Sequence, residues 1–312
     1  MILTVTLNPS VDRALEVGVL IRGEVLRAAD SHIDPGGKGV NVSRALLANG
    51  VRSTAVVPTG GAEGDQLVDM LRAEGVDMLA VPIAGRTRSN ITLAEPDGTV
   101  TKINEAGPVL SDAEFAQVSE AVLDAAATAD WVVICGSLPP GPGLAAFTDL
   151  CEKLVAAGTR LAVDSSGPAL LAGVAAGAAL VKPNREELAE AIGAPLTTVG
   201  DVVEACGRLR AGGAGAVLAS LGSDGAVLVD DAGVLAGSSP VSVPRSTVGA
   251  GDAMLAGFLA GGASGPAALT EGLAWGAAAV SLPGSRMPTP SDLDRTTVTV
   301  TLDPDLSRRL HP

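Results

Sequence analysis

The feature that most constrains this chain is the alternation of short apolar runs with longer amphipathic runs along most of its length. The apolar runs are predicted to be strands, at residues 2–7, 54–58, 131–135, 161–164, 180–182 and 216–220. Between them lie helical patterns, such as the one from Ser111 to about Ala127, where Ser111 and Glu114 form a capping box. Nearly continuous apolar strands separated by helices predict an α/β fold, with a central, mostly parallel sheet flanked by helices.

Two stretches depart from this alternation. Residues of about 12–34 and 88–105 alternate apolar and polar side chains with no helix between, and a Pro96-Asp97-Gly98 turn divides the second stretch. We expect antiparallel strands with one exposed face, which meet as a small β-sheet lid over the carboxyl edge of the main sheet, where such folds bind ligands. The expected division is a lid of residues 12–34 and 87–105 and a core of residues 1–11, 35–86 and 106–312.

The end of the chain has a different composition. From about residue 289 the sequence is rich in Thr, Asp and Arg, and Val298, Val300 and Leu302 alternate with polar residues. We expect an edge strand followed by a frayed end.

Composition and charge exclude some classes of partner. The chain has 312 residues, 47% of them hydrophobic, only 2% aromatic side chains and a net charge of -14. It is therefore large enough to bury a core, and a nucleic-acid partner is not expected, because such a partner needs a basic face and stacking aromatics. A small anionic ligand remains compatible with the acidic chain. Its lysines are Lys38, Lys102, Lys153 and Lys182.

Cysteine usage and hydropathy give further expectations. Cys135, Cys151 and Cys206 are far apart and form no metal or disulfide pattern, so we expect reduced structural thiols. There is no run of about 18 uncharged apolar residues and no basic segment followed by an apolar one at the start. We therefore expect no membrane partner and a cytoplasmic protein.

The strongest motif spans residues 245–260, RSTVGAGDAMLAGFLA. Gly249, Ala250 and Gly251 lead directly into an apolar helical run. Small residues there allow backbone N–H groups to converge at the helix N-terminus, which predicts an anion site. Asp252 follows in the first turn. It either caps the helix or takes a proton from an attacking hydroxyl while the amides hold a transferring phosphoryl group.

A second motif, PGGKGVNVSRAL, spans residues 35–46. Gly36, Gly37 and Gly39 surround Lys38, and Asn41 follows on the first helical turn. Glycine pairs alone are usually turns. An ammonium and an amide at one helix start favour a site for a polar ligand.

A third motif, KPNREE, spans residues 182–187, directly after a short apolar strand. Asn184 and Glu187 lie three positions apart on one helix face, an oxygen pair suited to orienting Mg²⁺ through its waters. The alternative is an ordinary N-cap with exposed acidic groups. Lys182 lies at the end of the preceding strand.

Weaker candidates accompany these motifs. Arg88 and Asn90, in the predicted lid, offer a guanidinium and an amide for phosphate or hydroxyl groups, although either is also typical of a surface. SLGSDGA, at residues 220–226, is a glycine turn after a strand. Asp164, at a strand end, is either structural or ligand-positioning and is left unassigned. His32 and His311 match no triad or metal pattern.

Several segments in combination carry a resemblance. They are TLNPSVD (6–12), DPGGKGVNVSRAL (34–46), TRSNI (87–91), GSLPPG (136–141), KPNREE (182–187), SLGSDGA (220–226) and STVGAGDAMLAGF (246–258). In this order they resemble the phosphofructokinase B branch of the ribokinase family of sugar kinases, over residues 1–286. Within it, TLNP and PGGKGxN are most similar to the 1-phosphofructokinases, with tagatose-6-phosphate kinases as nearest relatives.

The resemblance implies a ribokinase-like fold and a role for each motif. Asp252 would be the catalytic base, and the amides of Gly249, Ala250 and Gly251 the anion hole. The positions implied for the sugar phosphate are Asp12, Arg27, Gly36, Gly37, Lys38, Asn41, Arg88, Asn90 and Ser137. The positions implied for ATP are Lys182, Asn184, Glu187, Ser220, Gly222 and Gly225, with Asn184 and Glu187 holding Mg²⁺ through water. Lys38 and Lys182 would then lie at opposite ends of the reaction path, on the acceptor's phosphate and on ATP.

The implied activity is ATP-dependent phosphorylation of fructose 1-phosphate to fructose 1,6-bisphosphate, by a homodimer that associates through the lid. Tagatose 6-phosphate and fructose 6-phosphate are alternative acceptors, and a non-catalytic sugar-phosphate sensor is an alternative of another class. A dehydrogenase is disfavoured, because the first strand runs into NPSVD instead of a glycine fingerprint. Whether K⁺ binds stays open, because SLPGSR departs from the family pattern. The positions near a monovalent cation in some relatives are Ser246, Val248, Ala279, Gly284 and Arg286.

Overall fold

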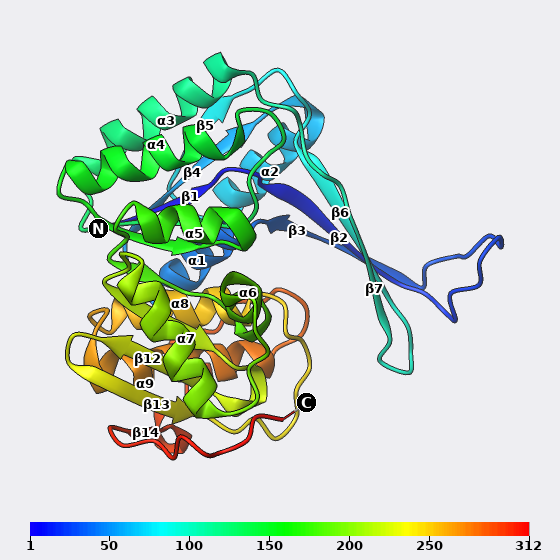
Figure 1. Ribbon diagram of the computed structural model, residues 1–312. Coiled ribbons are helices and arrows are strands. Elements are labelled where there is room, and N and C mark those ends of the chain that lie inside the picture. Colours follow the sequence, from blue (N-terminus) through cyan, green and yellow to red (C-terminus); the bar gives the residue numbers. More distant parts are fainter. Residues whose placement is uncertain (312) are drawn as a thin grey trace.

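A large sheet covered by helices on both faces and a separate small sheet make up the molecule (Figure 1), in a computed structural model that describes residues 1–311. The ten strands of the large sheet, in spatial order, are β14 (Thr299–Thr301), β13 (Gly233–Ser238), β12 (Ala226–Asp230), β11 (Ala216–Ser220), β10 (Leu180–Val181), β9 (Arg160–Asp164), β8 (Trp131–Cys135), β1 (Ile2–Thr6), β4 (Ser53–Thr59) and β5 (Met78–Pro82). The strands from β11 to β5 are parallel, which confirms the prediction of a mostly parallel sheet.

The remaining strands of this sheet, β12 to β14, continue it as antiparallel neighbours beyond β11. The glycine turn at residues 220–226 joins β11 and β12 in a hairpin. Of these three strands, only β14 was predicted, from the alternation near Val300. Its place at the edge of the sheet is confirmed.

The helices connect these strands and cover the sheet on both faces. They are α1 (Lys38–Ala48), α2 (Gly61–Glu74), α3 (Asp112–Ala126), α4 (Gly143–Ala156), α5 (Gly167–Ala175), α6 (Arg185–Ile192), α7 (Val199–Ala211), α8 (Ala250–Ala260) and α9 (Gly265–Val280). Short 3₁₀ turns are η1 (Gly222–Asp224), η2 (Pro290–Asp292) and η3 (Arg295–Thr297). The predicted start of α3 is confirmed, because Ser111 and Glu114 form the capping box. Within residues 1–311, no helix has the length and apolar character needed to cross a membrane.

The strand sequences explain why both faces are covered. In β8, Val132 and Ile134 belong to a core formed with α3, α4, α5 and α7, whereas Val133 and Cys135 belong to a second core formed with α1, α8 and α9. Side chains alternate between the faces of a strand, so a strand that is apolar at every position needs a helical layer on each side.

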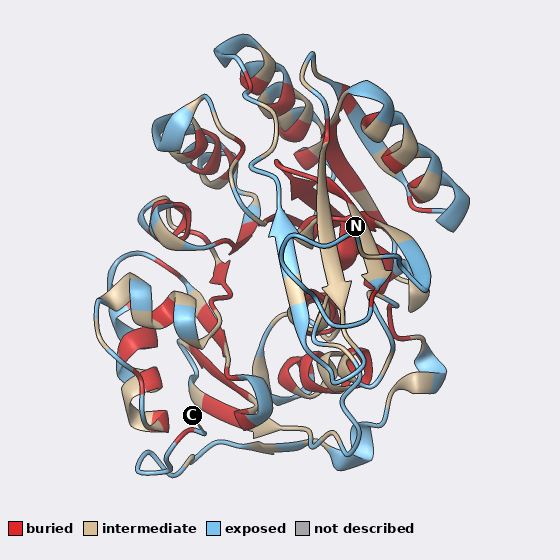
Figure 2. Ribbon diagram, turned by 90° about the vertical axis from the view of Figure 1, so that its right-hand side faces the viewer, coloured by how far each residue is buried: buried red, intermediate tan, exposed pale blue. Residues whose placement is uncertain are grey.

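The small sheet projects from the body of the molecule (Figure 1). Its strands are ordered β3 (Asp30–Gly36), β2 (Ser10–Glu16), β6 (Arg88–Ala94) and β7 (Val100–Asn104). Figure 2 shows its strands as largely intermediate or exposed, in contrast to the buried strands of the large sheet. The alternating sequence predicted one exposed face, but burial does not alternate along β6 and β7, so both faces of these strands are partly exposed.

The prediction that these strands are all antiparallel is wrong at one pairing. The pairs β2–β3 and β6–β7 are antiparallel, but β2 and β6 run parallel. β2 continues from β1 and β6 follows β5, and both of these are parallel members of the large sheet. Two segments that leave the same edge in the same direction pair in parallel.

The expectation of a frayed end is also wrong. The Val199 amide donates to the Arg308 carbonyl over 3.0 Å, and the Leu310 amide donates to the Thr197 carbonyl over 2.9 Å. Leu310 is buried in the core beside α7. An apolar residue in a polar tail thus provides an anchor that the sequence pattern did not reveal.

Candidate active site

The predicted site residues gather where three helices begin at the carboxyl edge of the sheet. Lys38 is the first residue of α1, Glu187 lies in the first turn of α6, and Asp252 lies in the first turn of α8. Asp164, the last residue of β9, lies among them. Helix N-termini carry partial positive charge, so their convergence favours an anionic ligand.

Asp252 is buried beside α1. Only 6% of the residue is exposed, and its Oδ2 accepts a hydrogen bond from Asn41 Nδ2 over 2.9 Å. Burial, reinforced by the negative charge of Asp164, raises the pKa of Asp252 to about 6. A carboxylate with a pKa near neutrality is suited to general-base chemistry.

The start of α8 lacks a side-chain cap among the described residues. Its N-cap, Gly249, is left-handed with φ of 74°, and Asp252 pairs with Asn41 instead of capping the helix. This geometry disfavours the capping alternative for Asp252. A Cβ atom placed on Gly251 would lie 3.5 Å from Lys182 Nζ, so an ammonium faces the predicted anion hole.

Asp164 is the functional candidate that sequence reasoning left unassigned. It is fully buried, and its Oδ1 accepts from Lys38 Nζ over 2.8 Å while its Oδ2 lies 2.9 Å from Lys182 Nζ. Burial disfavours its charged form, but the two ammonium groups hold its pKa below the usual range. The available signal for a role in the site was its place at the carboxyl end of a parallel strand, where such folds bind ligands.

The two lysines therefore do not lie at opposite ends of a reaction path, as expected, but on either side of one carboxylate. Lys38 Nζ also contacts Glu187 Oε1 over 3.3 Å. Asp164 and Glu187 raise the pKa of Lys38 despite its burial. An incoming phosphate would share these ammonium groups with the carboxylates.

Asn184 and Glu187 form the capping box of α6. The Glu187 amide donates to Asn184 Oδ1 over 2.8 Å, and the Asn184 amide donates to Glu187 Oε2 over 2.9 Å. In this structure the two residues therefore contact each other as an ordinary N-cap, which was the alternative to a magnesium site. Glu187 Oε1 points to Lys38, inside the site.

The base of the small sheet brings together further predicted residues. Asp12 and Asn90 are register partners, and Asn90 Nδ2 donates to Asp12 Oδ1 over 2.9 Å. Gly36 packs so closely on Asp12 that an added Cβ would lie 2.4 Å from Asp12 Cγ. A larger residue at this position would displace the Asp12 side chain. Gly37 is the N-cap of α1, so both glycines lead directly into Lys38.

Arg88 and Ser137 both contact Asn8, a residue to which the sequence analysis gave no role. Arg88 Nε donates to the Asn8 carbonyl over 3.2 Å, and Asn8 Nδ2 lies 3.3 Å from Ser137 Oγ. Asn8 is buried, and its amide oxygen has no partner among the described residues. The TLNP segment, which contains Asn8, was the sequence feature that could have identified it as a site residue.

Arg27 is not part of this cluster. It lies in the exposed loop between β2 and β3, at the far end of the projecting sheet (Figure 1). Within residues 1–311, no hydrogen bond or ion pair connects it to the other predicted residues.

The predicted ATP-side turn lies next to the α6 motif. Ser220 and Asn184 form an isolated parallel bridge, in which the Ser220 amide donates to the Pro183 carbonyl over 3.0 Å. Gly222 is the first residue of the following 3₁₀ turn, and Gly225 directly follows this turn. The structure thereby brings both predicted nucleotide motifs to neighbouring strand ends.

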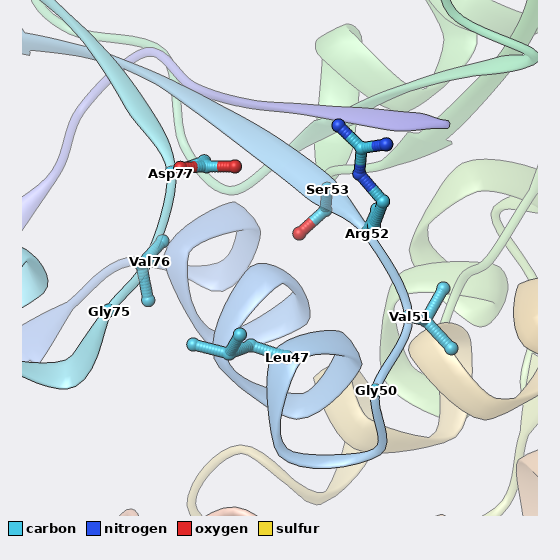
Figure 3. Close-up of a pocket in the computed structure, with 8 residues that line it drawn as sticks. All are labelled: Leu47, Gly50, Val51, Arg52, Ser53, Gly75, Val76 and Asp77. Carbon is cyan, nitrogen blue, oxygen red and sulfur yellow. The ribbon is translucent and has the colours of Figure 1, made fainter.

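Two concave pockets on the surface lie away from this cluster. One of about 140 Å³ is lined by residues that include Leu47, Arg52, Ser53 and Asp77 (Figure 3). These residues lie at the end of α1 and just before or at the starts of β4 and β5. The pocket is therefore at the amino edge of the sheet, opposite the charged cluster.

Comparisons with known proteins agree with this geometry. Residues 5–292 match the model of the "pfkB family carbohydrate kinase". The chain is similar to 1-phosphofructokinase of Rhodobacter capsulatus, with 40% identity over 83% of this chain and 82% of the relative. It is also similar to ATP-dependent 6-phosphofructokinase isozyme 2 of Escherichia coli, with 38% identity over 92% and 94% of the two chains.

Solved structures give the same result for the fold. A crystal structure of phosphofructokinase-2 from Escherichia coli in complex with potassium superimposes with a TM-score of 0.88 and 36% identity, and the match covers 93% of this chain and 96% of the other. The predicted architecture of a helix-flanked, mostly parallel sheet with a small second sheet is confirmed.

Proposed function

The chain belongs to the pfkB family of carbohydrate kinases, and we propose that its reaction is transfer of the γ-phosphoryl group of ATP to the 6-hydroxyl of fructose 1-phosphate. It is a sugar-phosphate kinase, as its phosphofructokinase relatives indicate. The choice of fructose 1-phosphate rests on the 1-phosphofructokinase relative and on the TLNP and PGGKGVN segments.

The observation that carries the mechanism is the buried Asp252 carboxylate at the start of α8, with a pKa raised to about 6. At neutral pH this group is largely ionised and accepts the proton of the attacking hydroxyl. Asn41 orients the carboxylate through its hydrogen bond. The oxygen of the acceptor then attacks the γ-phosphorus in line, and the bond to the β-phosphate oxygen breaks.

The negative charge that develops on the transferring group needs nearby donors. The amides of Gly249, Ala250 and Gly251 at the helix start would supply an anion hole, with the Lys182 ammonium facing the same corner. Such donors act most strongly where water is excluded, and Lys182 is only 3% exposed.

The chemistry of Glu187 fits a magnesium-nucleotide complex. Mg²⁺, when bound, neutralises phosphate charge and usually keeps several waters, so it needs few protein oxygens. Glu187 Oε1 is directed into the site, while Oε2 and Asn184 Oδ1 hold the start of α6. We propose that Glu187 accepts hydrogen bonds from magnesium-bound waters and that Asn184 keeps Glu187 in place.

The sugar phosphate would bind on the other side of Asp252, at the base of the small sheet. Lys38 and Arg88 provide positive charge, and Asp12, Asn41 and Asn90 provide groups for sugar hydroxyls. We propose that residues 12–34 and 87–105 act as a lid on a core of the remaining residues. Lid closure would exclude water and limit ATP hydrolysis.

A second acceptor is favoured by a specific observation, because the 6-phosphofructokinase relative matches more of the chain than the 1-phosphofructokinase relative does. Fructose 6-phosphate carries its phosphate at the other end of the same sugar, and tagatose 6-phosphate differs in addition in the configuration at C4. ATP consumption measured with each of these three sugars distinguishes the candidates. We expect the highest kcat/KM with fructose 1-phosphate. Turnover with none of them would identify a non-catalytic sensor instead.

The small sheet also supports a homodimer. Val100 and Ile103 on β7 expose more than half of their surface, and Val19 and Val25 are exposed in the loop between β2 and β3. Val100 and Ile103 lie on opposite faces of β7. β7 is an edge strand of the small sheet, and an edge strand with exposed apolar side chains can pair with a second copy. Sedimentation of the wild type and of a Val100→Asp, Ile103→Asp variant tests this, and an unchanged mass in the variant would reject the surface.

The proposal includes a monovalent-cation site near the end of α9. The amides of Arg245 and Ser246 donate to the Val280 carbonyl, which places Ser246 beside the C-terminus of this helix, where partial negative charge favours a cation. A potassium complex is known for the phosphofructokinase-2 of Escherichia coli. Activity in potassium chloride compared with choline chloride tests the site, and equal rates would remove it from the proposal.

A further inference from the structure

We infer that residues 305–311, the C-terminal strap, position the nucleotide-binding turn of the active site by holding the carboxylate of Asp224. The inference rests on the proposed function in one respect, namely that the turn at Gly222–Asp224 lies on the ATP side. Asp224 and the strap are then positioning elements and do not themselves touch the reacting atoms.

The contacts of Asp224 come from the strap. The Asp224 side chain is 2% exposed, and its Oδ1 accepts a hydrogen bond from Arg308 Nη1 over 2.7 Å and lies 2.9 Å from Nδ1 of His311. Its Oδ2 accepts from the His311 backbone amide over 2.8 Å. Arg308 Nη2 also donates to the Asp224 carbonyl over 3.2 Å. Both oxygens of a buried carboxylate are thus satisfied by residues more than 80 positions away.

The strap also reaches the second predicted nucleotide motif. Arg185, the first residue of α6, donates through its guanidinium to the His311 carbonyl and to the Leu196 carbonyl. Arg185 directly follows Asn184, which bridges to Ser220 at the start of the glycine turn. The strap therefore ties together the two loops that follow β10 and β11.

The turn itself is held by backbone hydrogen bonds: the Leu221 amide donates to the Gly225 carbonyl over 2.8 Å, and the Asp224 amide donates to the Leu221 carbonyl over 3.1 Å. Gly225 has φ of 88°, and an added Cβ there would lie 2.0 Å from the Gly237 carbonyl oxygen, so the turn is built from close backbone contacts. Asp224 supplies the long-range side-chain link from this turn to the strap. A charge-assisted link from outside adds to these local contacts and reduces opening of the turn.

Charge gives the strap a second effect. Without Arg308, the Asp224 carboxylate would stay buried with its strongest partner missing, next to a proposed polyphosphate site. An uncompensated negative charge there repels an anionic nucleotide. The guanidinium therefore both orders the turn and neutralises it.

The test measures MgADP binding by calorimetry, together with steady-state kinetics, for Arg308→Ala, Arg308→Lys and Arg309→Ala. Arg309 is the matched control, because it is exposed and has no ion pair among the described residues. We expect Arg308→Ala to weaken MgADP binding and to raise the KM for ATP about five- to tenfold, from the loss of one charge-assisted contact. The KM for the sugar phosphate and kcat should be unchanged, and Arg308→Lys should restore part of the loss.

A double variant separates the effect of the Asp224 charge on nucleotide binding from the effect of disorder in the turn. If uncompensated charge contributes, Asp224→Asn in the Arg308→Ala background should bind MgADP more tightly than Arg308→Ala alone. Hydrogen exchange at the amides of residues 220–226 reports the order of the turn directly, and we expect it to be faster in Arg308→Ala than in Arg309→Ala.

Two results would overturn the inference. One is MgADP binding by Arg308→Ala that equals binding by Arg309→Ala. The other is an equal rise in the KM for both substrates together with a lower Tm, which would show a general loss of stability. Failure of the proposed acceptor is seen separately, because the wild type would then bind MgADP without phosphorylating fructose 1-phosphate.

Discussion

Asn41 on α1 donates a hydrogen bond to Asp252 on α8 over 2.9 Å, although 211 positions separate the two residues. The contact joins the predicted sugar side of the site to the predicted catalytic group. It also opposes the effect of burial, since a hydrogen bond to the ionised carboxylate lowers the pKa that burial and Asp164 raise. The pair thus sets both the orientation and the basicity of the proposed base.

Replacement of the base tests its role. Asp252→Asn keeps the shape of the side chain and can still accept from Asn41, but it cannot take a proton. We expect kcat to fall about 10²- to 10⁴-fold, with MgADP binding unchanged. Asp149→Asn, at an exposed position on α4, is the control. An undiminished phosphorylation rate in Asp252→Asn would refute the assignment.

The pH dependence of the wild type follows from the same group. Asp252 must be ionised to act as a base, so kcat/KM should rise with pH through about 6, the folded-state pKa, and level off above it. In Asn41→Ala the hydrogen bond to the carboxylate is lost, and the rising limb should move to higher pH. A limb that stays in place would show that Asn41 does not tune Asp252.

Stability should respond to pH in the opposite direction. The folded-state pKa of Asp252 is raised above its usual value, so the folded protein binds the proton more tightly than the unfolded chain. The associated stability is present below pH about 4 and is lost as pH rises through about 6. Asp252→Asn removes this loss. At pH 8 we expect the variant to unfold at a higher urea concentration than the wild type, with a free energy of unfolding that is greater by at most about 3 kcal/mol. At pH 4 we expect no such difference.

A buried ion pair and an exposed one provide a matched comparison. Asp164 forms ion pairs with two ammonium groups and is not exposed to solvent, so Asp164→Asn leaves Lys182 buried and without its ion pair. We expect a loss of about 3–5 kcal/mol in the free energy of unfolding. Lys153→Ala breaks the exposed pair with Asp149 and should cost less than about 0.5 kcal/mol. Urea titration measures both, and equal effects would show that the Asp164 cluster is not a structural element.

The candidate site was predictable where a local motif carried the information. Lys38, Asn41 and Asp252 were identified because each lies at a helix start next to small residues. Asp164 was not assigned, because one acidic residue at the end of an apolar strand has no distinctive pattern around it. Its partners, Lys38 and Lys182, come from two different strand-to-helix connections.

The layered α/β class was predictable from the amino-acid sequence, because strands that are apolar at every position must be covered on both faces. The proposed anion-binding role of the helix starts was also predictable, because it depends on neighbouring glycines and is local. The tertiary structure alone decided that β2 and β6 are parallel, that two lysines share Asp164, and that Arg308 holds Asp224. Each of these depends on which distant segments meet. Hydrophobic periodicity specifies that a segment is buried, but not which segment lies beside it.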